Sequence, residues 1–227
     1  MVITIDGPAG SGKSTVARRL ARQLNLQYVD TGASYRAAAW LTISKKLDLA
    51  NDAAVIKLVQ SMEYAPGPLM ADMCQRIWVN GTEVTAAIRT PAVAEATSQL
   101  ATNPAVRQIL VDIQRKLAAG AANGAVLEGR DTGTVVCPDA GLKVFLVASP
   151  QERARRRAAE MSAAGREEDE QTVLEQLAKR DKRDSTRAAS PLAPAPGAHI
   201  IDTDNKGIDE VVNEILAMLP AGMLVCL

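Results

Sequence analysis

The chain has 227 residues, with 26 basic and 26 acidic side chains and therefore no formal net charge. This length suits one α/β domain with inserted subdomains and is too short for two enzymatic domains. The neutral balance excludes a generally basic surface, so contacts with nucleic acid or lipid would need local clusters of charge.

The composition also predicts a cytoplasmic location. No apolar run approaches the roughly 20 residues of a membrane span. The first predicted strand begins at Val2, which leaves no room for a signal peptide. The three cysteines, Cys74, Cys137 and Cys226, show neither C-x-x-C nor metal-binding spacing, which favours buried free thiols in a reducing compartment.

The most informative segment follows the apolar run of residues 2–5, which is typical of a buried parallel strand. It matches the pattern G-x-x-x-x-G-K-[ST], and an amphipathic helical pattern follows it directly. In this context glycines let backbone N–H groups surround phosphates, and the helix dipole favours the anion. We expect Lys13 to reach the β- and γ-phosphates of a nucleotide and Ser14 to hold Mg²⁺. The predicted phosphate-loop residues are Gly7, Pro8, Ala9, Gly10, Ser11, Gly12, Lys13, Ser14 and Thr15.

Four later segments are predicted to be strands of the same sheet. They are residues 27–29, 124–127, 143–147 and 199–201. Helical patterns separate them, and this alternation predicts a parallel, doubly wound sheet. Such sheets bind ligands at the carboxyl ends of their strands. The residues to examine are therefore 6–7, 30–32, 128–131, 148–149 and 202–203, which are polar or small.

A small antiparallel insert is predicted between residues 63 and 90. Asn80-Gly81 separates the β-rich runs 76–79 and 82–85. This dipeptide indicates a two-residue hairpin, because both central positions need positive φ. Two helices, at about 91–101 and 104–119, are expected to follow.

The segment after residue 148 predicts a hinged helical lid over about residues 151–172. Ser149, Pro150 and Glu152 combine an N-cap serine, a proline at the first helical position and the glutamate of a capping box. The helical pattern weakens at residues 163–165, and another helix follows a charged run. A final amphipathic helix is expected over 208–219. The sequence does not assign a role to the apolar tail, residues 223–227.

Phosphoryl transfer requires positive groups that arrive from several segments, because negative charge spreads over the transferring group. Arg153 and Arg157 lie four residues apart on the predicted lid helix, and Arg180, Asp184 and Arg187 share a face of the next helix. For any one of these arginines alone, a solvated charged face is the simpler interpretation.

Arg130 and Asp131 favour a functional interpretation more strongly, because they follow the predicted strand at 124–127. Arg36 likewise lies shortly after a predicted strand. The single histidine, His199, lies inside a predicted strand and is expected to be a core or edge residue rather than a catalytic base. The sequence shows no metal-ligand cluster and no paired nucleophile and base.

Together these segments resemble bacterial cytidylate kinases, in order and spacing, over nearly the whole chain. The matching segments are residues 7–15, 30–36, 129–136 and 180–187. The phosphate loop is common to many families, whereas D-[ST]-G-x-x-Y-R and G-R-D-x-G-T-V-V are far more specific. The resemblance implies a single P-loop kinase domain, residues 1–227, with a parallel five-stranded sheet flanked by helices, the insert on the substrate side and the lid. It further implies transfer of the γ-phosphoryl group of ATP to CMP or dCMP with Mg²⁺, by a monomer.

The resemblance also implies roles for individual side chains at the matching positions. It places Thr31, Arg107, Asp131 and Arg187 around the pyrimidine, Ser98, Arg180 and Asp184 near the sugar, and Arg36 and Arg130 near the substrate phosphate. The residues expected to act in catalysis are Lys13, Arg130, Arg153 and Arg157. A carboxylate such as Asp131 suits the amino group of cytosine, so UMP should be a poorer substrate. Thr31 stands where serine is frequent in the family, which adds a methyl group to the pocket.

Three other interpretations were weighed. Another P-loop kinase, acting on a different nucleotide or on a metabolite such as shikimate, fits the phosphate loop but not the G-R-D-x-G-T motif or the hairpin. A nucleotide-dependent switch lacks the guanine-reading N-K-x-D motif. Nucleic-acid binding would rest only on the arginines of 153–157 and 180–187, with few aromatic rings for stacking. We therefore expect ATP and CMP or dCMP as partners, and neither nucleic acid nor membrane.

Overall fold

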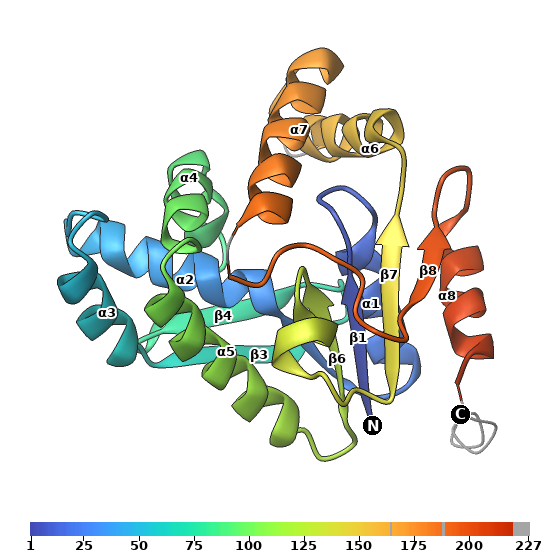
Figure 1. The fold of residues 1–227 in the computed structure, drawn as a ribbon, viewed down its shortest axis with the longest axis horizontal. Helices are drawn as coiled ribbons and strands as arrows, with labels where there is room; N and C mark the ends of the chain where they lie inside the picture. The colour runs from blue at the N-terminus through green and yellow to red at the C-terminus, as the bar shows by residue number, and fades with distance from the viewer. Residues whose placement is uncertain (164, 188, 220–227) are drawn as a thin grey trace.

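A parallel sheet of five strands forms the centre of the molecule (Figure 1). The computed structural model describes residues 1–163, 165–187 and 189–219; the tail at 223–227, including Cys226, lies outside these ranges. The strands follow the order β2-β6-β1-β7-β8, and all neighbours are parallel. Their bounds are Val2–Asp6 for β1, Gln27–Asp30 for β2, Ala125–Gly129 for β6, Leu142–Val147 for β7 and His199–Asp202 for β8. The five predicted strands and their parallel arrangement are confirmed.

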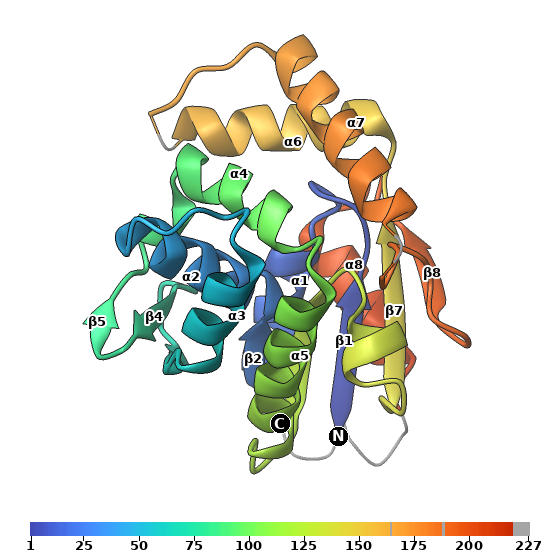
Figure 2. The same cartoon turned by 60° about the vertical axis from the view of Figure 1, so that its left-hand side comes forward.

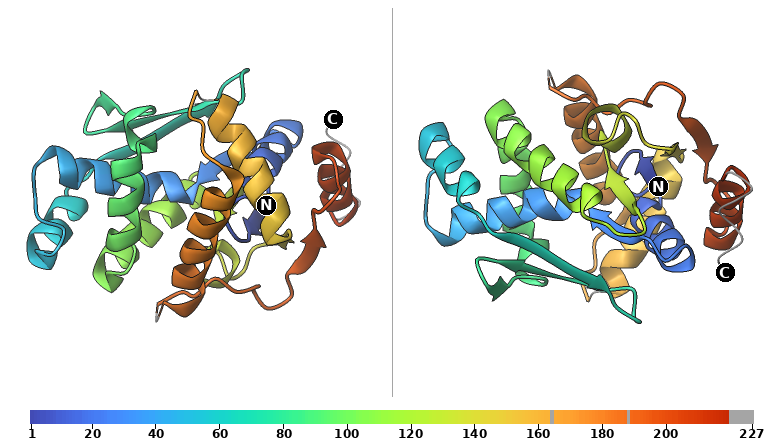
Figure 3. Two further views of the ribbon diagram at one scale, coloured as in Figure 1. Left: turned by 90° about the horizontal axis from the view of Figure 1, so that it is seen from above. Right: turned by 90° about the horizontal axis from the view of Figure 1, so that it is seen from below.

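Helices cover both faces of this sheet. They are α1 (Lys13–Gln23) and α8 (Ile208–Ala217) on one face, and α5 (Pro104–Ala119) with the short turn η2 (Thr132–Val136) on the other. Figure 3 shows α8, in red, beside α1, in blue. Along β6, Val126 packs toward α1, whereas Ala125 and Leu127 pack toward α5. This alternation is the two-residue period of a strand buried on both faces.

A second core lies beside the sheet, on the side of β2. It holds α2 (Thr31–Ser44), α3 (Asp52–Gln60), the turn η1 (Ala87–Arg89), α4 (Pro91–Leu100), the first half of α5 and the antiparallel strands β3 (Tyr64–Leu69) and β4 (Gln75–Val79). The third strand of this sheet, β5 (Thr82–Glu83), is exposed. The predicted hairpin is confirmed, because Asn80 and Gly81 adopt φ values of 49° and 75° between β4 and β5. Strand β3 was not predicted, since Pro66 and Pro68 argue against a strand. Proline is tolerated there because β3 is an edge strand.

The helices α6 (Pro150–Ala163) and α7 (Glu170–Thr186) lie across the carboxyl ends of β1 and β7 (Figure 2). They pack on each other and on the phosphate loop through Ala9, Ala154 and Leu177. The predicted boundary of the lid, at residue 172, therefore falls inside the first turn of α7.

The start of α6 at Pro150 is confirmed, but its cap differs from the prediction. The Ser149 hydroxyl accepts a hydrogen bond from the N–H of Glu152 at 3.3 Å, as expected for an N-cap. The reciprocal contact is made by another residue, because the N–H of Ser149 donates to the Asp204 carboxylate at 2.9 Å. Glu152 instead binds Arg155 and Arg156. The loop after β8 therefore holds the N-terminal end of α6.

Three smaller predictions can be compared with the structure. His199 is exposed on the edge strand β8, and the sequence predicted either a core or an edge position for it. Cys74 and Cys137 are free but only half-buried, so the expectation of buried thiols was wrong for both. Among the residues that the structure describes, no helix has the length and apolar character needed to cross a membrane.

Candidate active site

The phosphate loop connects the end of β1 to the first turn of α1. Gly7, Gly10 and Gly12 adopt φ values of 146°, 78° and 88°, which disfavour residues with a side chain. A Cβ atom at Gly7 would lie 2.2 Å from the carbonyl oxygen of Leu146. The loop is therefore shaped by its backbone, at a helix N-terminus that attracts anions.

Lys13 is buried beneath this loop. Its side-chain nitrogen donates to the carbonyl oxygen of Pro8 at 2.5 Å, and the residue is 6 % exposed. Burial, followed by the positive charge of Arg130, places the pKa of Lys13 well below its ordinary value. An anion bound in the loop would supply the negative partner that this ammonium group lacks.

Asp6 connects the end of β1 to the segment that follows β6. Its carboxylate oxygens accept hydrogen bonds from the backbone N–H groups of Thr132 and Gly133, at 2.9 and 2.8 Å, and from the Thr132 hydroxyl. Burial raises the pKa of Asp6. These bonds fix the backbone directly after Arg130 and Asp131. No role was predicted for Asp6, and its only signal in the sequence is its place at the end of a predicted strand.

Thr31 lies at the carboxyl end of β2, next to the end of β6. Its hydroxyl donates to the backbone carbonyl of Glu128 at 2.7 Å. The Glu128 carboxylate is itself buried and accepts a hydrogen bond from the Tyr28 hydroxyl at 2.8 Å. The Thr31 hydroxyl thus donates its hydrogen to a carbonyl group of the protein, and its oxygen can still accept a hydrogen bond from a ligand.

Arg107, on α5, forms a buried ion pair with Asp131. The Arg107 guanidinium also lies over the ring of Tyr35, 5.4 Å from its centre. Burial and then the charge of Arg107 lower the pKa of Arg187, while the charge of Asp131 opposes this shift. The structure therefore brings together Arg107, Asp131 and Arg187, which were all expected near the pyrimidine. Tyr35 was not predicted as part of this group.

Asp184, on α7, is shared by three arginines. Its carboxylate lies 2.9 Å from Nε of Arg130 and 4.0 Å from nitrogens of both Arg180 and Arg187. Burial alone would raise the pKa of Asp184, but these guanidinium groups, with Arg130 first, lower it. Asp184 thereby joins α7 to the segment after β6.

Positive charge accumulates beside Asp184. The guanidinium of Arg130, followed by the surrounding protein atoms, lowers the pKa of Arg180 to about 10, and the charges of Arg36 and Arg157 add to this effect. Arg130 and Arg180 also act on Lys13. A cation whose pKa is lowered by other cations lies in a region with surplus positive charge. Such a region is suited to a ligand with several negative charges, such as a nucleotide pair.

Three predicted site residues have other partners in this structure. Arg153 is 6 % exposed and donates to the carbonyl oxygen of Ala9 at 3.1 Å and to Asp181 at 2.5 Å, so it fastens α6 and α7 to the phosphate loop. Arg157 pairs with Glu160 near the surface at 2.9 Å. The Ser98 hydroxyl donates within its own helix, to the carbonyl oxygen of Ala94 at 3.2 Å.

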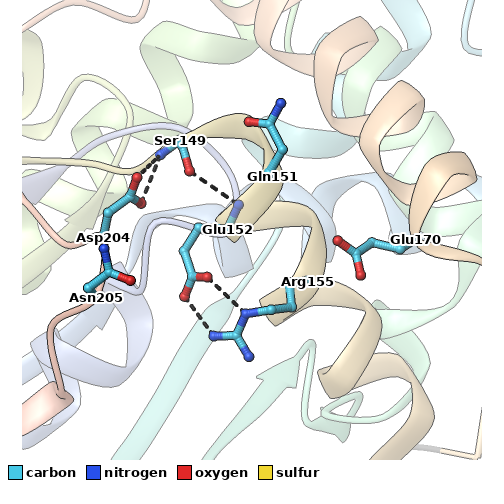
Figure 4. A pocket seen from close by; sticks show the side chains of 7 residues that line it. All are labelled: Ser149, Gln151, Glu152, Arg155, Glu170, Asp204 and Asn205. Atoms are coloured by element: carbon cyan, nitrogen blue, oxygen red, sulfur yellow. Dashed lines mark hydrogen bonds and ion pairs between the residues drawn. The ribbon is translucent and has the colours of Figure 1, made fainter.

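The sequence did not predict a further contact, which joins α6 to the loop after β8. The Arg156 guanidinium donates to the hydroxyl and the carbonyl oxygen of Thr203, at 2.9 and 2.6 Å. A cavity of about 240 Å³ adjoins the base of α6 (Figure 4). It is lined by Ser149, Gln151, Glu152, Arg155, Glu170, Asp204 and Asn205. None of the predicted site residues lines it.

Comparison with known proteins gives a consistent result. A family model described as "Cytidylate kinase" matches residues 3–221. The chain is 48% identical to a cytidylate kinase of Pelotomaculum thermopropionicum, covering 97% of this chain and 96% of that protein. It is also 48% identical to a bifunctional pantoate ligase/cytidylate kinase of a Synechococcus species, covering 96% of this chain but 40% of that protein. An uncharacterized protein of Eubacterium ventriosum shares the fold, with a TM-score of 0.50 and 14% identity over 96% of both chains.

Proposed function

Because the chain belongs to the cytidylate kinase family and so transfers a phosphoryl group from ATP to CMP or dCMP, we propose that the residues at the carboxyl ends of β1, β2 and β6 perform this transfer. The observation that carries the proposal is the group of three arginines, Arg130, Arg180 and Arg187, that shares the single carboxylate of Asp184. The family match also excludes a kinase of a different substrate class, such as a shikimate kinase.

On the donor side, the backbone of residues 7–12 surrounds the phosphates of ATP. Lys13 gives up its hydrogen bond to the Pro8 carbonyl and binds the β- and γ-phosphates instead. Ser14, half-buried in the first turn of α1, would be the protein ligand of Mg²⁺. Bound Mg²⁺ would neutralise charge on the bridging phosphate oxygens. The donor set fits this ion, because Mg²⁺ takes one or two protein ligands beside phosphates. The described residues contain no group of three acidic, histidine or cysteine side chains placed to hold a metal by themselves.

On the acceptor side, Arg36 and Arg130 orient the phosphate of CMP for in-line attack on the γ-phosphorus. Asp184 holds Arg130 in place from α7. The acceptor phosphate is already anionic at neutral pH, so the transfer needs no general base. Arg157 reaches the transferring group by releasing the exposed Glu160, whereas Arg153 would have to release Asp181 and the phosphate loop.

The base pocket distinguishes cytosine from uracil through Asp131. Arg107 engages Oδ2 of this carboxylate, and we assign Oδ1 to the exocyclic amino group of cytosine. Thr31 and Arg187 lie around the same ring, and Ser98, Arg180 and Asp184 serve the sugar. Uracil presents an acceptor in place of the amino group, which would leave Oδ1 of Asp131 without a donor. The site therefore favours CMP over UMP.

The family resemblance supports a monomer as the working unit. The activity and the nucleotide substrates support a cytoplasmic location.

The proposal is tested by the variant Arg130→Gln, with Arg76→Gln as the matched control. Arg76 is half exposed on β4, and it forms a long ion pair, 3.9 Å, with Glu83. Loss of a charged contact to phosphate should lower kcat/KM for CMP about 100-fold or more, because the contact strengthens as charge develops. The dissociation constant of an ATP analogue should change little in either variant. Equal activity of the two variants, both folded, would refute the role of Arg130.

A further inference from the structure

Gly32 stands in the first turn of α2, where alanine would form the better helix. Glycine is favoured where the backbone adopts positive φ, but the φ angle of Gly32 is not positive. The reason for a glycine at this position therefore has to be space.

The space above Gly32 is filled by an ion pair. A Cβ atom at residue 32 would lie 2.9 Å from a terminal nitrogen, Nη1, of Arg36 and 3.2 Å from Oδ1 of Asp30. Real Cβ atoms do not approach other atoms to 2.9 Å, so the guanidinium would have to move. The two atoms in the way are the ends of the Arg36 and Asp30 side chains. The backbone of α2 would therefore tolerate alanine at position 32, but the ion pair between these side chains would be displaced.

Asp30 holds the other side of the same guanidinium. Its Oδ1 atom accepts a hydrogen bond from the N–H of Ala33 and caps α2, while Oδ2 pairs with Nη2 of Arg36 at 2.7 Å. The two side chains are 11 % and 23 % exposed. Burial alone would raise the pKa of Asp30, but the charge of Arg36 lowers it, so the pair stays ionised at neutral pH. Asp30 accepts a hydrogen bond from the terminal nitrogen Nη2 of Arg36, and the other terminal nitrogen, Nη1, is left to bind another ligand.

The position of this pair makes it relevant to the acceptor. Asp30 ends β2, in register with Glu128 of β6 at the edge where the site lies. Arg36 is also one of the cations that lower the pKa of Arg180. A small displacement of the guanidinium would therefore change the geometry of the cationic group that receives the substrate phosphate.

We propose that Gly32 and Asp30 are positioning residues for the acceptor phosphate, because Asp30 pairs with one terminal nitrogen of Arg36 while Gly32 leaves room for the other. This inference rests on the proposed function of Arg36 as a ligand of the CMP phosphate. Neither Gly32 nor Asp30 contacts the substrate in this account. Both act through the place and orientation of one guanidinium group.

The first test is Gly32→Ala, measured by steady-state kinetics and thermal unfolding. The KM for CMP should rise about 10- to 100-fold, the loss expected when one charge-assisted hydrogen bond is removed. The KM for ATP should stay the same, and Tm should be unchanged or higher because alanine favours the helix. Gly120→Ala is the control, since Gly120 also has no positive φ and caps α5 in the connection to the amino end of β6, away from the carboxyl ends of the strands. It should leave both KM values unchanged.

Asp30→Asn provides a second variant, because asparagine still caps a helix but removes the charge that pairs with Arg36. It should also raise the KM for CMP without a change in the KM for ATP. Competitive inhibition by cytidine, which has no phosphate, should be the same in wild type and both variants. A loss of cytidine binding would mean that the variants disturb the base pocket, and would overturn the proposal.

The variant Arg36→Lys separates the inference from the proposed function. If Gly32 acts through Arg36, Gly32→Ala should have little further effect on the KM for CMP in the Arg36→Lys background. If Arg36→Lys raises this KM but Gly32→Ala and Asp30→Asn do not, or if the effects add in full, the positioning role is wrong and the function of Arg36 stands. If Arg36→Lys leaves the KM for CMP unchanged, Arg36 does not bind the acceptor phosphate and both statements fail.

Discussion

The donor and acceptor sides of the site are built in different ways. The donor side is one continuous segment, residues 7–15, whose glycine backbone forms the loop and whose Lys13 lies beneath it. The acceptor side collects side chains from α2, α5, α7 and the segment after β6. Its arginines are already paired with carboxylates, as in Arg107 with Asp131 and Arg130 with Asp184. The donor side thus depends on backbone shape, and the acceptor side on ion pairs between distant elements.

This difference has an energetic consequence. Removing one member of a buried ion pair leaves the other charge without a partner, which costs more than the pair itself contributes. A substitution on the acceptor side therefore disturbs its partners, whereas a glycine substitution in the loop disturbs the backbone. The two sides should respond differently to the same kind of change.

The largest effect is expected from Lys13→Ala. It removes a cation that is buried beneath the phosphate loop, so kcat should fall about a thousandfold or more, as for other preorganised charges that act on a transferring phosphoryl group. The protein should still fold, because Lys13 makes its close contact with a backbone carbonyl that other groups can solvate. Lys57→Ala, at an exposed position of α3, is the control. Near-normal turnover of folded Lys13→Ala would contradict the assignment of the donor side.

A somewhat smaller effect on ATP binding is expected from Gly7→Ala. Comparison with Gly124→Ala distinguishes a change in the shape of the loop from a loss of overall stability. Gly7→Ala and Gly124→Ala both place a Cβ atom against backbone, 2.2 Å from the Leu146 oxygen and 2.0 Å from the Met1 oxygen, at positive φ. Each should destabilise the protein by about 2–4 kcal/mol, measured by urea unfolding. Only Gly7→Ala should also weaken ATP binding, by about 100-fold, because several backbone donors shift together. Equal loss of ATP affinity in the two variants would show that the effect is one of stability.

The sequence predicts the donor side better than the acceptor side for the same physical reason. A loop formed by consecutive residues shows its function in its spacing, and its place between a strand and a helix follows from local patterns. The acceptor pairs join residues far apart in the chain, such as Arg130 and Asp184, and no spacing rule matches a given arginine to its carboxylate. Family resemblance named the members of these pairs, but not their pairing.

The same limit explains the other differences. Arg153 and Arg157 share a helix face in the sequence, yet the structure holds Arg153 against Ala9 and Asp181, which only the packing of α6 on the phosphate loop determines. Asp6 has no motif, and its role depends on the segment that follows β6. The sheet itself was predicted in full because each buried strand is a short local run. Strand β3 was missed because its prolines are acceptable only at an edge.

Asp131→Asn tests the central claim most directly, because asparagine keeps the size of the side chain and removes its charge. The measurement is kcat/KM for CMP and UMP, together with the dissociation constant of an ATP analogue. We expect kcat/KM for CMP to fall about 10- to 100-fold, the preference for CMP over UMP to shrink, and ATP affinity to stay unchanged. Equal losses in CMP turnover and ATP affinity would contradict it, because Asp131 would then support the fold rather than read the base.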